Sequence, residues 1–192
     1  MLETTIDIEA QKKEFLDLCH NNIHREGLDA LLGYLEKSDF FTAPASTRFH
    51  GAYAGGLAQH SLDVYHYALR AKDLYDGEIN LEHLTVAALF HDLCKVNFYK
   101  VEMRNKKING QWQEVPAYTV EEKFAYGGHG SKSVFLIERY MRLELEEAVA
   151  INCHMGFSDV QNTLSISEAY SRCPLAWIIH VADEAATYLL SR

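Results

Sequence analysis

The sequence has little cysteine, and its four cysteines are spread along the chain as Cys19, Cys94, Cys153 and Cys173. No two of them are close enough to form a CxxC motif, which argues against a zinc site built from thiolates. Reduced thiols in a cytosol are the simplest interpretation of this pattern. We therefore expect a cytoplasmic protein without disulfides.

Positive charge is also in short supply. Lys and Arg number 18 against 27 Asp and Glu, so the formal net charge is −9. A long nucleic-acid footprint needs many basic side chains to neutralise phosphates, and this balance argues against one. A small phosphorylated substrate stays open as a partner, because a bound metal ion can supply local positive charge.

Long hydrophobic runs, repeats and linkers are missing as well. No apolar run is long enough to span a bilayer, and the start "MLETTIDIEAQKKEF" has neither the basic nor the apolar part of a signal peptide. We expect no membrane partner, and we expect residues 1–192 to form a single domain.

What the sequence does have is helical periodicity over most of its length. We expect N-terminal helices within about residues 5–37, then a loop at "FFTAPASTRFHGAYAGG". The remaining predicted helices cover about Leu57–Tyr75, a segment from the N-cap Asn80 to near Cys94, Ser131–Met141, Glu144–His154 and Pro174–Leu190.

One segment lacks this helical periodicity. Residues of about 97–120 alternate polar with apolar or aromatic side chains, and Asn109-Gly110 is a strong turn signal. The sequence therefore predicts an all-α helical bundle with a small β-hairpin insertion.

Polar residues in apolar surroundings are the main functional signal. In "ALFHDLCK", His91 and Asp92 end an otherwise apolar helix. Burying that carboxylate without a cation would cost several kcal/mol. Imidazole and carboxylate are ligands of Zn, Mn, Fe, Co and Ni. A capping or ion-paired Asp beside a core His is the alternative.

Four further positions share this character. His60 points inward on its predicted helix, one turn before Val64. His129 lies among glycines in "YGGHGSKS", His154 ends the apolar run "AVAINCHMG", and Asp183 interrupts "LAWIIHVADEAATYLL". Because several such residues can offset their burial by meeting at a cation, we expect them to form a metal site.

The order H…HD…H…H…D resembles the HD-domain superfamily of metal-dependent phosphohydrolases, in the variant that holds two ions. "GGLAQHSLDV" is similar to the first-histidine helix of that family, and "ALFHDLCK" to its "HDxGK" motif. The resemblance covers about residues 50–190, where we expect the metal-site core. Cys94 replaces the glycine that is common in the motif.

The resemblance implies roles for individual residues. His60, His91, Asp92 and Asp183 would form the primary metal site, and Asp92 would bridge to a second ion held by His129 and His154. Lys95 would contact a substrate phosphate, so Asp92 and Lys95 are the expected catalytic pair. The cofactor would be a divalent transition metal, as two ions of Mn, Fe, Co, Ni or Zn, with Mg as a further option.

Aromatic residues crowd the expected mouth of the site. They are Phe49, Tyr53, Phe98, Tyr99, Trp112, Tyr118, Tyr126 and Phe157. Packing of the hairpin and loops is one interpretation, and a stacking surface for a base is the other. If the aromatic residues form a stacking surface, Tyr99 and Trp112 would bind substrate together with Lys95. Asp63 and His180, each one turn from an expected ligand, are candidates for orienting the ligand rings.

The function predicted from these residues is hydrolysis of a phosphomonoester or phosphodiester of a nucleotide-like small molecule. A di-iron oxidase is an alternative, because imidazole and carboxylate also suit iron. A 3′–5′ exoribonuclease is a further alternative, which the lack of a basic groove weakens. A binding module without catalysis is the last, and the retained ligand set argues against it.

Overall fold

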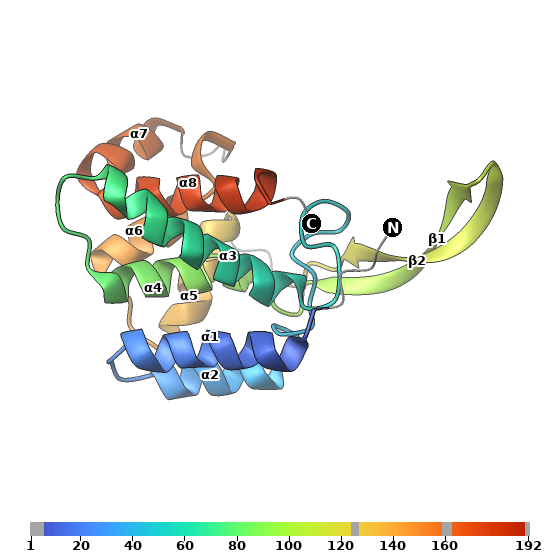
Figure 1. Ribbon diagram of the computed structural model, residues 1–192, viewed down its shortest axis with the longest axis horizontal. Helices are drawn as coiled ribbons and strands as arrows, with labels where there is room; N and C mark the ends of the chain where they lie inside the picture. The colour runs from blue at the N-terminus through green and yellow to red at the C-terminus, as the bar shows by residue number, and fades with distance from the viewer. Residues whose placement is uncertain (1–5, 124–126, 159–162, 191–192) are drawn as a thin grey trace.

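The computed structural model describes residues 6–123, 127–158 and 163–190, with side chains of the last range from residue 165. Within these ranges the protein is mostly helical and carries one two-stranded hairpin (Figure 1), so the predicted fold class is confirmed. The α-helices are α1 (Ile8–Asn22), α2 (Leu28–Lys37), α3 (Gly56–Ala71), α4 (Leu81–Phe90), α5 (His129–Glu138), α6 (Leu145–Cys153), α7 (Thr163–Arg172) and α8 (Pro174–Tyr188). Short 3₁₀ turns are η1 (Lys72–Leu74), η2 (Leu93–Lys95) and η3 (Gly156–Ser158).

Local sequence sets where several helices begin. The Asp7 carboxylate accepts a hydrogen bond from the Ala10 N–H at the start of α1, and the Asn80 side chain caps α4. Glu144 forms a capping box with the third residue of α6. Pro174 occupies the first turn of α8, where its missing N–H costs nothing.

The helices pack around α3, which contacts both α4 and α8, while α6 joins α8 to α5. The pair α1 and α2 forms a layer beneath this group, with α1 against α3 and α4 (Figure 1). Edge-on contacts of the Phe15 ring with Phe40 and Phe90 fill the junction between the layers. This packing fixes the inner ends of α3, α4, α6 and α8 relative to one another.

A partly buried ion pair fastens the α1–α2 loop to the rest of the molecule. The Arg25 guanidinium forms a two-pronged contact with the Glu147 carboxylate of α6, at 2.7 and 2.8 Å, and its Nε lies 2.8 Å from Glu82 of α4. Such fork geometry holds both partners in one orientation. The clamp therefore sets α6 relative to α4 and to the first helical layer.

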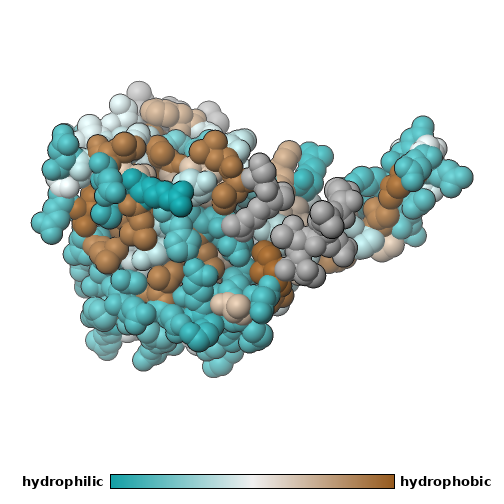
Figure 2. Space-filling model, viewed as in Figure 1, coloured by the Kyte–Doolittle hydropathy of each residue, from teal (hydrophilic) through white to brown (hydrophobic). Residues whose placement is uncertain are grey.

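The predicted hairpin is present as β1 (Tyr99–Ile108) and β2 (Gln111–Val120), which pair from Tyr99↔Val120 to Ile108↔Gln111. The φ angles at Asn109 and Gly110 are +50° and +84°, as a two-residue hairpin turn requires. The ribbon projects from the helical body (Figure 1), and hydrophobic residues interrupt its hydrophilic surface (Figure 2). Val101, Met103 and Trp112 are all exposed there.

Some helix bounds differ from the prediction. The helix expected to reach Cys94 ends at Phe90, and the backbone of Asp92 has left the helical region with φ −102° and ψ 22°. Helix α7 was not predicted, because among its described side chains only Ile166 is buried, which leaves little periodicity to read.

No helix in the described ranges has the length and apolar composition that crossing a membrane requires.

Candidate metal centre

Five of the six predicted ligands meet where four helices converge. His60 lies on α3, His91 and His154 end α4 and α6, Asp92 follows α4, and Asp183 lies on α8. Two groups have their ligand atoms within 4.8 Å of one another: His60, His91 and Asp183, and His91, Asp92 and His154. His91 is common to both groups, so the two form one continuous cluster.

The carboxylate of Asp92 faces the cluster with both oxygens. Its Oδ2 lies 3.6 Å from His60 Nε2 and 3.5 Å from His91 Nε2. Its Oδ1 lies 3.7 Å from His154 Nε2. Asp92 is therefore placed to serve two neighbouring positions, one on each oxygen.

Two of the histidines are oriented by the helix ends that carry them. The last carbonyls of a helix lack partners within it. His91 Nδ1 donates to the Ala88 carbonyl at 2.9 Å, and His154 Nδ1 donates to the Ile151 carbonyl at 2.7 Å. Because a carbonyl only accepts, the proton of each neutral ring resides on Nδ1 and Nε2 keeps a lone pair. Both lone pairs are available to a cation.

The cluster fits a bound metal on its own geometry. His154 Nε2 is buried without a hydrogen-bond partner, and the Nε2 atoms of His60 and His91 approach to 3.3 Å. A buried polar atom without a partner is costly, and ligation by a cation removes that cost. Nitrogen and carboxylate oxygen donors are those of first-row transition ions and zinc.

Electrostatics at the centre favour ionised acids. Burial opposes the charge of Asp92, but the attraction of Lys95 and His91 outweighs it and holds the Asp92 pKa well below its usual range. The pKa of Asp183 is lowered in the same way, against burial, by the hydrogen bond from His60. Burial lowers the pKa of His154 to about 4. The centre therefore holds two ionised carboxylates, Asp92 and Asp183, beside a neutral His154 at neutral pH.

Lys95, the predicted phosphate contact, lies beside Asp92. Its Nζ is 2.6 Å from Asp92 Oδ2, at the end of η2. Burial opposes its charge, yet the attraction of Asp92 raises its pKa above the ordinary value. A permanent cation therefore stands at the edge of the cluster.

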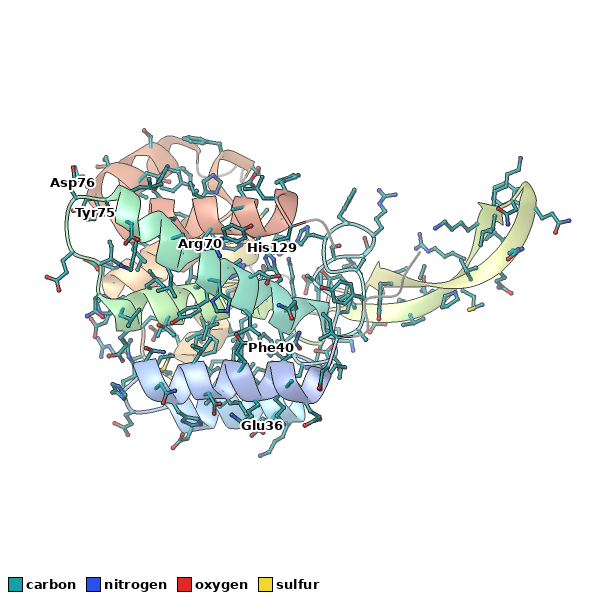
Figure 3. All side chains as sticks on the ribbon, in the orientation of Figure 1. Glu36, Phe40, Arg70, Tyr75, Asp76 and His129 are labelled. Atoms are coloured by element: carbon teal, nitrogen blue, oxygen red, sulfur yellow. The ribbon has the colours of Figure 1, made fainter. Side chains whose placement is uncertain are left out.

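His129 is the predicted ligand that the structure does not bring into either group. It is exposed at the first position of α5, and its Nδ1 lies 3.4 Å from Cys94 Sγ. In the view of Figure 3 His129 is labelled over the helical body, away from the labels of Asp76 and Glu36. His129 thus stands beside the cluster, with the Cys94 thiol between them.

The two aromatic residues predicted to bind substrate lie at opposite ends of the hairpin. Tyr99 lies at the base of the hairpin, and its hydroxyl donates to the Ala45 carbonyl at 3.0 Å. Trp112 pairs with Lys107 next to the hairpin turn and is 72% exposed. The ribbon that carries it projects away from the helices of the cluster (Figure 1), and Trp112 lies near the turn of this ribbon rather than at its base. Tyr126 lies outside the described residues.

The residues expected to orient the ligands also differ. His180 Nδ1 donates to the backbone carbonyl of His154 at 2.8 Å, which supports the end of α6. Asp63 accepts a hydrogen bond from Gln59 on its own helix and lines a small pocket with His60. His180 is therefore placed against a segment that bears a predicted ligand.

His50 is a site residue that the sequence reasoning missed. Its ring centre lies 5.0 Å from that of His60, and it lines the same pocket as Tyr53 and Asp63. Burial lowers its pKa to about 4. The signal was available, because "FHGAYAGG" places an imidazole among glycines just before the first-histidine helix. The residue was read as part of a loop.

Comparisons with known proteins agree with this geometry. The sequence profile of the HD domain family matches residues 57–188. A curated relative, the dihydroneopterin 2′,3′-cyclic phosphate phosphodiesterase of Methanocaldococcus jannaschii, is 27% identical over 148 residues, which are 74% of this chain and 51% of the relative. The chain thus spans about half the length of that relative. No solved structure matches the chain.

Proposed function

The chain belongs to the HD domain family, and on this basis we propose that it is a metal-dependent phosphohydrolase acting on a phosphate ester of a nucleotide-like small molecule. The observation that carries the proposal is the buried cluster. It consists of two groups of three His and Asp ligands, and both groups contain His91. The similarity to a protein named as a cyclic phosphate phosphodiesterase gives further support.

Each side chain of the cluster has a role in this proposal. His60, His91, Asp92 and Asp183 would hold one divalent ion, and Asp92 with His154 and His129 would hold a second. When bound, such ions polarise a phosphoester and lower the pKa of water to near neutrality. The Nδ1–H bonds of His91 and His154 keep their rings in the ligating orientation.

Lys95 supplies the remaining charge. Its ammonium group is hydrogen-bonded to Asp92 and can turn one of its other N–H bonds toward a phosphate oxygen. In doing so it would orient the ester and offset the negative charge that grows on its oxygens. His50, in the pocket beside His60, is placed to contact the part of the substrate beyond the phosphate.

The test is a panel of phosphomonoesters, 2′,3′-cyclic phosphates and dinucleotides, assayed with Mn, Co, Ni, Zn, Mg and Fe(II). We expect turnover of at least one ester class, and Asp92→Ala should lower it more than about 100-fold with loss of bound metal. Helix content by circular dichroism should stay unchanged. The matched control is Asp29→Ala, an exposed carboxylate in the first turn of α2.

Two results would contradict the proposal. One is full metal content by elemental analysis in Asp92→Ala, which would mean that the ions bind elsewhere. The other is oxygen consumption with iron in place of ester cleavage with every metal, which would favour the oxidase alternative.

A further inference from the structure

Cys94 occupies a position that the proposed function does not use. Its side chain is 1% exposed and lies between Asp92 and His129. The Sγ atom is 4.0 Å from Asp92 Oδ1 and 3.4 Å from His129 Nδ1. The thiol therefore joins the cluster to the one predicted ligand that stands outside it.

The two oxygens of Asp92 have different surroundings. Oδ2 faces the Lys95 ammonium, His60 and His91. Oδ1 faces His154 Nε2 at 3.7 Å and the thiol of Cys94. His154 is 1% exposed, and its Nε2 has no hydrogen-bond partner. An unsatisfied buried nitrogen thus points to the same oxygen as the thiol does.

The backbone holds the thiol in this place. The Cys94 N–H donates to Ser133 Oγ of α5 at 3.0 Å, and η2 packs against α5. The next residue closes the turn, since the Lys95 N–H donates to the Asp92 carbonyl at 2.9 Å. Cys94 is therefore fixed between the segment that carries Asp92 and the helix that begins with His129.

We propose that Cys94 is a ligand of the ion bound on the Oδ1 side of Asp92, together with His154 and His129. Neither Cys94 nor His129 belongs to the two described groups whose ligand atoms lie within 4.8 Å of one another, so both side chains would turn toward the ion as it binds. As the metal–sulfur bond forms, the thiol proton leaves to solvent. One sulfur, two imidazoles and one carboxylate match the tetrahedral preference of zinc and cobalt(II). The chain would then select these ions at that position over Mg²⁺ and Mn²⁺, which prefer oxygen ligands. The inference rests on the proposed function only in requiring that the cluster binds divalent ions.

The experiment uses Co²⁺ as an optical probe on the full-length chain. Metal-free protein is titrated with Co²⁺ without oxygen, and near-ultraviolet absorption is followed for the thiolate-to-cobalt charge-transfer band. We expect the band in the wild type and its loss in Cys94→Ser and Cys94→Gly. The matched control is Cys19→Ala, because Cys19 is a fully buried thiol of α1 in the hydrophobic core and should leave the band unchanged.

Metal preference gives a second measurement. Competition between Zn²⁺ and Mn²⁺ should shift toward Mn²⁺ by about tenfold or more in Cys94→Ser, because a hard oxygen replaces a soft sulfur. X-ray absorption on the zinc-loaded wild type should show one sulfur neighbour, and this readout needs no variant. It keeps the proposal testable even if substitution of Cys94 unfolds the protein.

The outcomes separate the two proposals. Cobalt binding without a thiolate band, and a zinc shell of only nitrogen and oxygen, would show that Cys94 is not a ligand while leaving the phosphohydrolase proposal intact. Failure of the wild type to bind any divalent ion would overturn both.

Discussion

Each end-of-helix histidine in the centre is held by the backbone a few residues before it. His91 and His154 both donate Nδ1–H to the carbonyl three positions earlier. A helix C-terminus therefore does two things here, since it satisfies one of its own carbonyls and presents a lone pair to the cluster. The geometry of the ligands depends on where α4 and α6 end.

Gly130 has a similar local importance, and its substitution gives a test. A Cβ atom at this position would meet the backbone oxygens of Asn152 and Ile151 at 2.4 and 2.6 Å. Those atoms belong to the last turn of α6, just before His154. Gly130→Ala should therefore push α5 from α6 and cost about 1–3 kcal/mol of unfolding free energy. Urea unfolding would measure the loss of stability, and the affinity for Zn²⁺ would report the displacement of α5 from the end of α6 that carries His154.

Gly33 provides the control. It lies in α2, and a Cβ atom there meets nothing within 4 Å. Gly33→Ala should be neutral or stabilise the protein by about 0.5–1 kcal/mol, because alanine favours the helix. Equal stabilities of the two alanine variants would mean that α5 and α6 are not in close backbone contact.

The hairpin is anchored at its base and free along most of its length. Tyr99 is tied to Ala45 by its hydroxyl, and Thr119 is buried, whereas most of the remaining side chains are exposed. Two-stranded ribbons have little stability of their own in water. The outer part should therefore contribute little to the stability of the helical body.

Shortening the hairpin tests this view. Residues 103–116 would be replaced by Asn-Gly between Glu102 and Ala117, which form a directly opposed pair. Glu102 lies six positions from Ile108, and this even offset preserves the hydrogen-bonding pattern beside the turn. We expect the free energy of unfolding, measured by thermal denaturation, to change by less than about 1 kcal/mol and the helix content to be retained.

Tyr99→Phe, which removes the anchoring hydroxyl, serves as the contrast and should cost about 1 kcal/mol. A large loss of stability on shortening the hairpin, with little loss in Tyr99→Phe, would mean that the outer ribbon is structural.

Stability of the metal-free protein should depend on pH through its buried histidines. The pKa of His154 is about 4 in the folded chain against about 6.5 when unfolded, so the unfolded state binds more protons between these values. Stability is therefore lost as the pH falls from about 6.5 to about 4, by up to about 3 kcal/mol from this residue. His50 acts in the same direction.

His91, whose pKa is raised because Asp92 outweighs the opposing effect of burial, changes stability only above about pH 6.5. Urea midpoints at pH 7, 6 and 5 would measure the acid limb, which should be shallower in His154→Gln than in the wild type. His20→Gln, an exposed change on α1, is the control. Added Zn²⁺ should steepen the profile, because it binds only neutral imidazole and its stabilising effect therefore fades as the pH falls. Constant stability from pH 7 to 5 would contradict the prediction.

Much of the architecture follows from sequence pattern alone. Periodicity, caps and the Asn109-Gly110 turn predict a helical protein with one hairpin, and both that fold class and the resemblance to the HD family are confirmed. The cluster was foreseeable because His60, Asp92 and Asp183 interrupt apolar segments, where an unpaired polar group is costly. That residues 1–192 act as one domain stays a prediction.

The remaining features depend on positions in space that no local pattern contains. Trp112 was expected to bind substrate, and it lies near the turn of a ribbon that projects from the helices, so its contact with substrate stays a prediction. His50 was missed because its loop has no period to show which way it faces. The helix before Asp92 ends four residues earlier than expected, since the apolar run continues beyond the last helical turn.

The projecting ribbon also has an optical consequence. The chain contains two tryptophans, Trp112 near the ribbon turn and Trp177 on α8. Trp112 is 72% exposed and Trp177 is 38% exposed. The two indoles should therefore differ in the wavelength of their emission maximum and in how strongly a soluble quencher reduces their fluorescence. A Trp177→Phe protein would emit from the ribbon alone, and a blue shift of its spectrum would report any molecule that covers that surface, whether or not the metal centre is occupied.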